Sequence, residues 1–270
     1  MARRDQRKEK ERRLILLGSC LFVFATIVAG LVISMLLRGA AEHPMADANN
    51  CPLEGPRAVY AVVIDDTDTI GDVTRQQLRS EILSYARRVP QFGELQIYMA
   101  GPNPSTLLKP TFRRCNPGTG DGLSGVDHNL PRIRENYQKL YNRPLEQSLD
   151  RLLVLQQADR SPIMEGLQAV SVAAFPPDTA NKPRALLIAS DLLQNSDQYS
   201  VYKGFDPATA AEAARYYHAA IQGVDVDILK IPRASDKALQ LNPEFTGFWT
   251  AWFAESGARL NSITPLQGMN

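Results

Sequence analysis

Five side chains in three separate segments carry the oxygen atoms that a hard divalent cation binds. They are Asp65, Thr67 and Thr69 in DDTDT, Ser161 in RSPIM, and Asp191 in LLIASD. Carboxylate and hydroxyl oxygens, completed by water, are the ligands that Mg²⁺ and Ca²⁺ take in proteins. The residue types therefore predict a cation site, on the condition that the fold brings the three segments together.

A buried strand is expected to position the first segment. Residues 58–64 form a short apolar run with several β-branched side chains, and Asp65 follows it directly. Such a run is typical of the central strand of an α/β sheet, buried on both faces. Asp65 and Asp191 would end neighbouring parallel strands, about 4.8 Å apart. Two carboxylates that close repel each other unless a cation or a proton lies between them.

Strands and helices alternate along most of the chain after residue 57. Strands are expected over 58–65, 95–100, 106–113, 185–190, 224–231 and 258–263, and helices over 73–89, 131–157, 161–175, 208–222 and 243–256. Right-handed crossovers would place the helices on both faces of a mostly parallel, doubly wound, six-stranded sheet with one antiparallel edge strand, which is an α/β fold. The helix over 131–157 is expected to break or kink before Pro144. The aromatic residues of 245–253 are expected to pack in the core.

Two helix starts carry capping signals. Thr74 and Gln77 have the spacing of a capping box. Ser161 is a good N-cap, and Pro162 suits the first helical position. Ser161 would then lie at a helix N-terminus.

Together these features resemble a von Willebrand factor type A domain over residues 57–265. That family has the strand order 3-2-1-4-5-6, with the third strand antiparallel. Its metal-ion-dependent adhesion site, or MIDAS, uses D-x-S-x-S after the first strand, a Thr that begins a later helix, and an Asp at the end of the fourth strand. The matching residues of this chain are Asp65, Thr67, Thr69, Ser161 and Asp191.

The resemblance implies that these five residues hold Mg²⁺, or else Ca²⁺ or Mn²⁺. Threonines replace both serines of the first motif, and Ser161 replaces the family's Thr; each replacement keeps a hydroxyl oxygen. Leu192 follows Asp191 where Gly is usual. A site of the same fold that has lost its metal is the alternative.

The implied topology also bears on Cys51 and Cys115. An antiparallel third strand would end at the edge of the sheet where the first strand begins. Cys115 follows that third strand and Cys51 precedes the first, so the resemblance implies a disulfide between them. Closing a loop of about 65 residues would stabilise the fold by roughly 4 kcal/mol in the chain-entropy model.

The N-terminal part is typical of a membrane anchor. Residues 1–13 form a basic tail, residues 14–37 an uncharged apolar segment, and residues 38–57 a linker to the domain over 58–270. A helix over 14–37 would be roughly 36 Å long, enough to span a hydrocarbon core of about 30 Å. A cleaved signal peptide, with Ala46-Asp47-Ala48 as its cleavage site, is the alternative, although the apolar run is longer than a signal sequence requires.

The basic flank predicts that the N-terminus stays in the cytoplasm. The chain would then be a single-pass signal-anchor protein of the inner membrane of a bacterial envelope, with a periplasmic, extracytoplasmic domain. Because 30 basic and 29 acidic side chains nearly cancel, no charge excess indicates nucleic acid.

The predicted function is a binding or scaffold module, not an enzyme, that recruits an envelope protein through a divalent cation. A metal-free scaffold of the same fold is one alternative. The other is a metal-dependent phosphatase-like hydrolase that uses the D-x-D segment Asp66-Thr67-Asp68.

Overall fold

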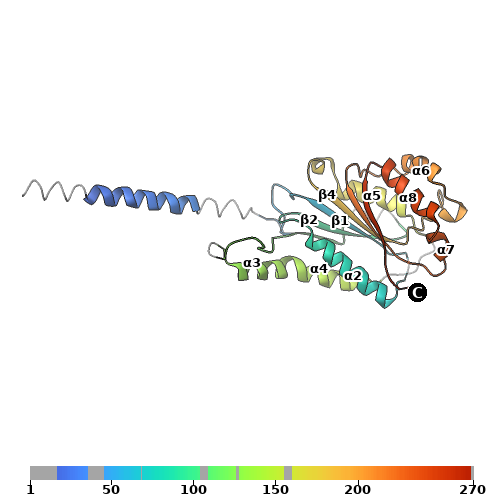
Figure 1. The fold of residues 1–270 in the computed structure, drawn as a ribbon, viewed down its shortest axis with the longest axis horizontal. Helices are drawn as coiled ribbons and strands as arrows, with labels where there is room; N and C mark the ends of the chain where they lie inside the picture. The colour runs from blue at the N-terminus through green and yellow to red at the C-terminus, as the bar shows by residue number, and fades with distance from the viewer. Residues whose placement is uncertain are drawn as a thin grey trace, which may run out of the picture. The chain divides into compact units, whose positions relative to one another are not determined.

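The computed structural model of the chain describes residues 17–35, 46–67, 69–103, 109–125, 128–154 and 160–268. It divides into two compact units, Met1–Met45 and Ala46–Asn270. In the first unit the described residues form one helix, Leu17–Met35, drawn in blue in Figure 1, which is long and apolar enough to cross a membrane. It coincides with the predicted transmembrane segment over 14–37, of which residues 14–16 and 36–37 lie outside the described ranges.

A six-stranded sheet forms the centre of the second unit. Its strands run in the order β3-β2-β1-β4-β5-β6. They are β1 Val59–Asp65, β2 Glu94–Ala100, β3 Phe112–Cys115, β4 Arg184–Ser190, β5 Asp225–Lys230 and β6 Arg259–Pro265. All neighbouring strands are parallel except β2 and β3. The predicted α/β fold, with its strand order and antiparallel edge strand, is confirmed.

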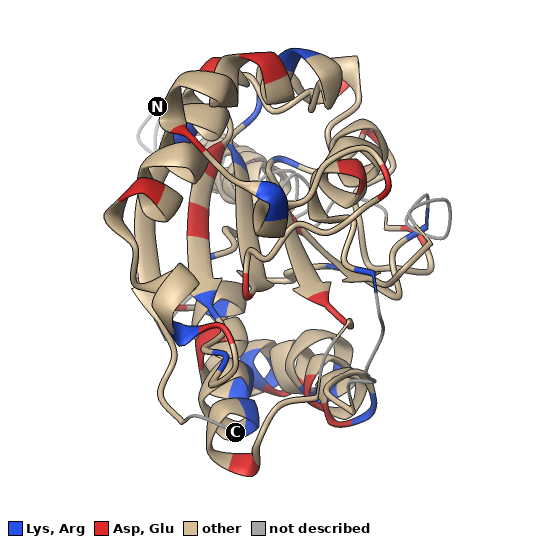
Figure 2. Cartoon of the chain, turned by 90° about the vertical axis from the view of Figure 1, so that its right-hand side faces the viewer, with Lys and Arg blue, Asp and Glu red and all other residues tan. Residues whose placement is uncertain are grey.

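Helices cover both faces of this sheet (Figures 1 and 2). One core cluster includes residues of α5 Ile163–Ala174, α6 Ala210–Tyr216 and α8 Pro243–Glu255. The other includes residues of α2 Asp72–Arg87, α3 Leu130–Tyr137 and α4 Arg143–Leu152. In β1, Ala61 and Val63 belong to the first cluster, whereas Val62 and Ile64 belong to the second. Successive side chains of a strand point to opposite faces, so an uninterrupted apolar run is buried on both sides.

The aromatic residues of α8 pack in the core, as predicted. All five have no measurable exposure: Phe245, Phe248, Trp249, Trp252 and Phe253. Ring contacts such as the edge-to-face pair of Trp249 and Trp252, with centroids 5.7 Å apart, join them to one another. This cluster supports β4 and the loop that follows it.

Three predicted elements differ from the structure: the third strand, the helix over 131–157 and the helix over 208–222. The third strand spans Phe112–Cys115 rather than 106–113, of which residues 106–108 lie outside the described ranges. The helix predicted over 131–157 ends at Leu152. The break or kink predicted before Pro144 takes the form of a five-residue π-helical segment, Gln138–Asn142, which joins α3 to α4. Such a segment widens the turn locally, and Pro144 is then accommodated in the first turn of α4.

The helix predicted over 208–222 is much shorter, because α6 ends at Tyr216. After it, Tyr217, Ala219 and Ile221 are buried while the residues between them are exposed. Alternation with a period of two requires extended backbone rather than a helix. The alanine-rich composition favoured helix, but burial of these three side chains determined the local structure.

The capping-box prediction for α2 is wrong. The N-cap is Gly71, without a side-chain bond. The hydroxyl of Thr74 donates to the carbonyl oxygen of Gln267 at 2.9 Å, and the side chain of Gln77 accepts from the backbone N of Gln267 at 2.6 Å. Both residues therefore hold the C-terminal segment against the start of α2.

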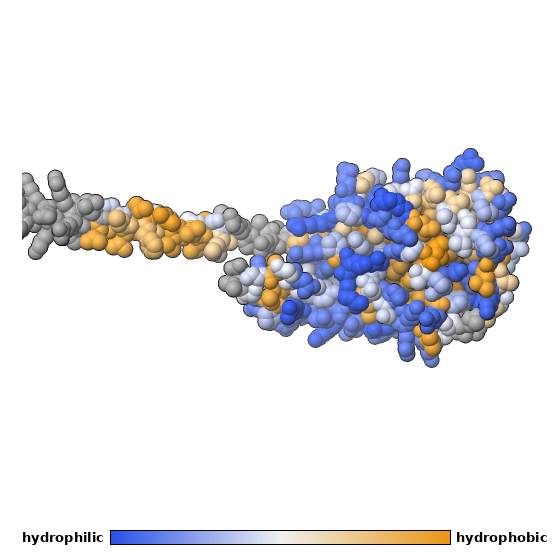
Figure 3. All heavy atoms as spheres, in the orientation of Figure 1, coloured by the Kyte–Doolittle hydropathy of each residue, from blue (hydrophilic) through white to orange (hydrophobic). Residues whose placement is uncertain are grey.

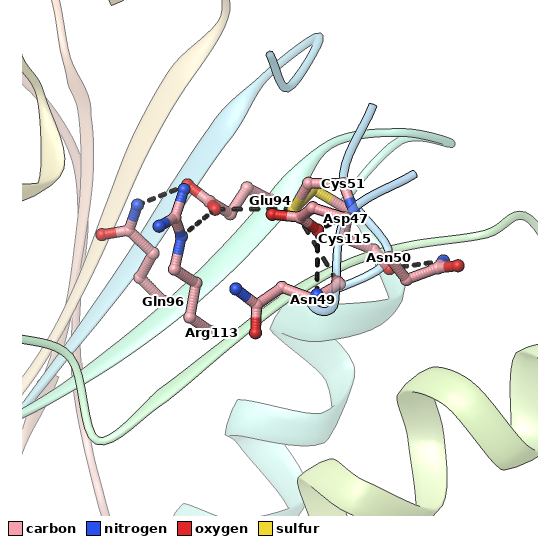
Figure 4. Close-up of a disulfide and its surroundings, with 8 residues drawn as sticks. All are labelled: Asp47, Asn49, Asn50, Cys51, Glu94, Gln96, Arg113 and Cys115. Atoms are coloured by element: carbon pink, nitrogen blue, oxygen red, sulfur yellow. Dashed lines mark hydrogen bonds and ion pairs between the residues drawn. A yellow bond between two sulfur atoms is a disulfide. The ribbon is translucent and has the colours of Figure 1, made fainter. Parts of the chain in front are cut away.

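The predicted disulfide between Cys51 and Cys115 is confirmed (Figure 4). It joins the segment before β1 to the end of β3. The backbone N of Cys115 also donates to the carbonyl oxygen of Asn49 at 3.0 Å. Residues 46–57, which the sequence assigned to the linker over 38–57, therefore belong to the compact unit that begins at Ala46. Residues 38–45 lie outside the described ranges.

Candidate metal centre

The carboxyl ends of β1 and β4 lie side by side and carry the first groups of the site. The two strands are parallel, with Ile64 opposite Ala189. Asp65 and Ser190 therefore end them next to each other. On the other side of β1, the backbone N of Asp66 donates to the carbonyl oxygen at the end of β2 at 2.9 Å. Ligands of open α/β sheets bind at this carboxyl edge.

Asp65 is the centre of a buried hydrogen-bond network. Its Oδ1 accepts from the backbone N of Thr67 at 3.1 Å and from Thr67 Oγ1 at 2.5 Å. Its Oδ2 accepts from Ser190 Oγ at 2.8 Å and from Ser161 Oγ at 3.3 Å. Thr67 Oγ1 and Ser161 Oγ lie 3.1 Å apart. The structure thus brings Asp65, Thr67 and Ser161 together, although they come from separate segments.

Ser161 reaches Asp65 because it precedes α5 instead of capping it. The predicted N-cap is wrong by one residue: Pro162 is the N-cap and the helix begins at Ile163. The backbone of Ser161 pairs in both directions with Asn195 in the loop after β4, at 3.0 and 2.8 Å. This pairing holds the Ser161 hydroxyl over the carboxyl edge of the sheet.

Asp191 is buried beside this network but has different partners. Its Oδ1 accepts from the backbone N of Leu193 at 2.8 Å. Its Oδ2 lies 2.8 Å from Nε of Arg233, which follows β5, the other neighbour of β4. Its carbonyl oxygen accepts from Nε2 of Gln240 at 2.9 Å, at the end of α7 Lys237–Gln240. The structure therefore pairs Asp191 with a guanidinium.

Burial disfavours the charged forms of all three ionisable groups. It raises the pKa of Asp65, although hydrogen bonds from the surrounding hydroxyls oppose this rise. Burial, and then the charge of Asp65, raise the pKa of Asp191 well above its usual value. Burial lowers the pKa of Arg233, whereas the charges of Asp65 and Asp236 raise it. Added positive charge at this edge of the sheet would stabilise both carboxylates.

The donor set fits a small, hard divalent cation. It consists of carboxylate and hydroxyl oxygens, with neither imidazole nor thiolate among the described residues of the network. Thr69 lies in the same loop and is exposed, and its role as a ligand stays a prediction. Asp68 lies outside the described residues. Because Arg233 already contacts Oδ2 of Asp191, a cation that used this oxygen would meet the positive charge of the guanidinium.

The sequence reasoning missed Ser190, Arg233 and Gln240. Ser190 had a usable signal, since it is the polar end of an apolar strand directly before Asp191. Arg233 had a weaker one: the implied strand order places the loop after β5 beside Asp191. Gln240 gave no signal, because its contacts depend on where α7 packs.

Leu192 adopts a backbone conformation that glycine favours. Its φ is +64°, in the left-handed region. Its backbone N donates to Ser190 Oγ at 2.9 Å, and its carbonyl oxygen accepts from Nε1 of Trp249 at 3.1 Å. Its side chain is buried. These contacts explain how leucine occupies the position where the resembling family has glycine.

We expect Leu192→Gly to destabilise the fold less than Leu192→Ala. Both variants lose a buried side chain, and Leu→Ala changes in cores cost about 2–5 kcal/mol. Only glycine also relieves the left-handed conformation, by about 1 kcal/mol. Urea unfolding of the two variants measures the difference. A larger loss for glycine would contradict the strain assigned to this position.

A cavity of about 750 Å³ lies elsewhere, beside α6. Four aromatic and two acidic side chains contribute to its lining: Tyr199, Phe205, Tyr216, Tyr217, Asp206 and Glu212. No residue of the network around Asp65 and Asp191 is among those that line it. The candidate metal centre is therefore not part of this cavity.

No model of a known protein family and no curated protein matches this chain. Proximal thread matrix protein 1 from the mussel byssus is similar in structure, with 12% identity over 78% of this chain and 42% of that chain, and a TM-score of 0.35. The conserved hypothetical protein BatB of Bacteroides thetaiotaomicron has 10% identity over 77% of this chain and 90% of that chain, with a TM-score of 0.38.

An aerotolerance-related membrane protein of Bacteroides fragilis is also similar. It has 8% identity over 63% of this chain and 65% of that chain, with a TM-score of 0.31. This chain thus spans less than half of the mussel protein. At these identities and TM-scores, the similarities assign neither a family nor an activity.

Proposed function

We propose that this chain is a membrane-anchored binding module that recruits a partner protein through a divalent cation. Mg²⁺, or else Ca²⁺ or Mn²⁺, would bind among Asp65, Thr67, Thr69, Ser161 and Asp191. The observation that carries the proposal is the convergence of three hydroxyls on the buried Asp65 carboxylate, beside a second buried carboxylate. Water and an acidic side chain of the partner would complete the coordination shell.

The apolar helix supports anchoring in a membrane. In Figure 3 its surface is mostly hydrophobic, whereas the visible face of the folded unit is mostly hydrophilic. We place the N-terminus in the cytoplasm because residues 1–13 are rich in Lys and Arg. The folded unit would then lie in the periplasm of a bacterial envelope, where its disulfide would persist.

The partner would be an envelope protein rather than nucleic acid. In Figure 2, Lys and Arg positions are interspersed with Asp and Glu positions along the ribbon of the folded unit. Specificity would therefore come from the cation and the loops around it. An acidic side chain on the partner is the simplest complement to a cation with an incomplete shell.

A metal-free scaffold of the same fold is the second candidate. The ion pair between Arg233 and Asp191 favours it, because the guanidinium already supplies positive charge to one of the two carboxylates. Recruitment by such a scaffold would not depend on divalent ions. The hydrolase alternative based on Asp66-Thr67-Asp68 has no comparable observation in its favour.

Partner capture with and without chelation separates the two candidates. The full-length protein in detergent micelles is used to capture envelope proteins in Mg²⁺, in EDTA, and in EDTA followed by excess Mg²⁺. We expect capture in Mg²⁺, loss in EDTA and recovery when Mg²⁺ returns. Equal capture in all three conditions would overturn the cation-bridged function and favour the scaffold.

A further inference from the structure

Arg233 is held in place by two separate sets of contacts. Its guanidinium contacts Asp191 at 2.8 Å, and its side chain is 21% exposed. Its backbone N donates to Oε1 of Gln240 at 2.8 Å. Nε2 of Gln240 donates in turn to the carbonyl oxygens of Asp191 and Ile231, both at 2.9 Å. The buried Gln240 amide therefore fixes the loop after β5 to the loop after β4.

A guanidinium and a divalent cation at the same carboxylate oxygen repel each other, so the two compete for Asp191. Oδ2 of Asp191 accepts from Arg233, while Oδ1 accepts from the backbone N of Leu193. Exchange of the guanidinium for a divalent cation at Oδ2 would place a charge of two where there was a charge of one. The added positive charge would stabilise the buried carboxylates of Asp65 and Asp191. This gain in free energy would oppose the free energy lost with the hydrogen-bonded ion pair between Arg233 and Asp191.

Arg233 has a second acidic group within electrostatic reach. The charge of Asp236 raises the pKa of Arg233 and contributes to the raised pKa of Asp191, so Asp236 acts on both partners of the ion pair. Asp236 lies three residues further along the same loop and is only partly buried. The two residues between them, Ala234 and Ser235, are exposed. Asp236 is therefore an alternative acidic partner for the guanidinium on the same loop.

We propose that Arg233 is a tethered counter-cation that occupies the candidate metal centre and is displaced when a divalent ion binds. The proposal rests on the function proposed above and describes its regulation. The ion-free and ion-bound forms would then differ in the loop 232–236, which borders the surface that a partner contacts. The two candidate functions become two states of one site, with Arg233 or a divalent ion as the alternative cation.

Ion affinity and the state of Arg233 itself test the exchange. Mn²⁺ affinity is measured by electron paramagnetic resonance for the full-length wild type, Arg233→Met and Arg233→Lys. Arg259→Met is the matched control, because it removes an exposed ion pair with Asp225 at the opposite edge of the sheet. The Nε–H resonance of Arg233 is assigned by its absence in Arg233→Met and is followed during titration with diamagnetic Mg²⁺.

We expect Arg233→Met to bind Mn²⁺ about tenfold more tightly than the wild type, which corresponds to ~1.4 kcal/mol. Arg233→Lys should lie between them, and Arg259→Met should match the wild type. Mg²⁺ should shift the Arg233 Nε–H resonance and speed its exchange with water. If the wild type binds Mn²⁺ but Arg233→Met binds no more tightly, the exchange is overturned while the cation-dependent function stands. If none of the variants binds Mn²⁺, both are overturned.

Discussion

Asparagine in place of Asp65 is expected to lower the affinity for Mn²⁺ and Mg²⁺ by about a hundredfold, or ~2.7 kcal/mol. Among the described residues, Asp65 is the one carboxylate that contacts all three hydroxyl-bearing side chains of the network. Asparagine keeps its size but removes its charge and replaces one acceptor oxygen with a donor. The affinity of a site for a hard cation depends on the number of charged oxygen ligands, so this change acts directly on binding.

Isothermal titration calorimetry of Asp65→Asn and the wild type measures this effect. Asp225→Asn is the control, because Asp225 begins β5 at the opposite edge of the sheet and pairs only with the exposed Arg259 among the described residues. Circular dichroism establishes that the variant keeps its fold. Wild-type affinity in a folded Asp65→Asn variant would exclude Asp65 as the centre of the site.

Loss of the disulfide should have the largest effect on stability. Replacing Cys51 and Cys115 together with alanine is expected to lower the free energy of unfolding by about 4 kcal/mol, because the sequence separation of 64 constrains a long loop of the unfolded chain. Cys51 Sγ also lies 3.5 Å from the carboxylate of Glu94, which pairs with Arg113 on β3. Segment 46–57 should detach from the sheet edge first, since the bond attaches it there.

Urea unfolding of the double variant in a constant detergent background gives this value. Cys20→Ser provides the control, because Cys20 is a free, exposed cysteine in the apolar helix. The Cys20→Ser variant should have the same midpoint urea concentration of unfolding as the wild type. A loss of less than 1 kcal/mol in the double variant would mean that the disulfide adds little to the contacts of the segment itself.

The strand order was predictable because strong local patterns coincided with one known topology. The apolar run before Asp65 matches β1, and the Leu186–Ala189 run lies within β4. Helix ends were less predictable. Tyr217 ends α6 early because its ring is buried, and Thr74 bonds the C-terminal segment instead of capping its own helix. Both outcomes depend on distant parts of the chain that local propensity does not include.

The candidate site was predictable only in part for the same reason. The types and order of Asp65, Thr67 and Ser161 match a known motif, and the structure places them within hydrogen-bonding distance, while their role as ligands stays a prediction. Arg233 was not found, because the implied strand order places the loop after β5 beside Asp191 without showing which side chain of that loop reaches the carboxylate. Charges that neutralise a buried site often come from such tertiary neighbours.

Saturable Mn²⁺ binding to the wild-type chain tests the cation site most directly. The full-length protein in detergent micelles is titrated with Mn²⁺, and free ion is followed by electron paramagnetic resonance. We predict a single class of sites with one ion per chain, from which excess Mg²⁺ displaces Mn²⁺. If no saturable binding is seen up to about 10 mM Mn²⁺, the result would contradict a metal centre at Asp65 and Asp191. That concentration exceeds the dissociation constants of even the weakest extracellular Ca²⁺ sites.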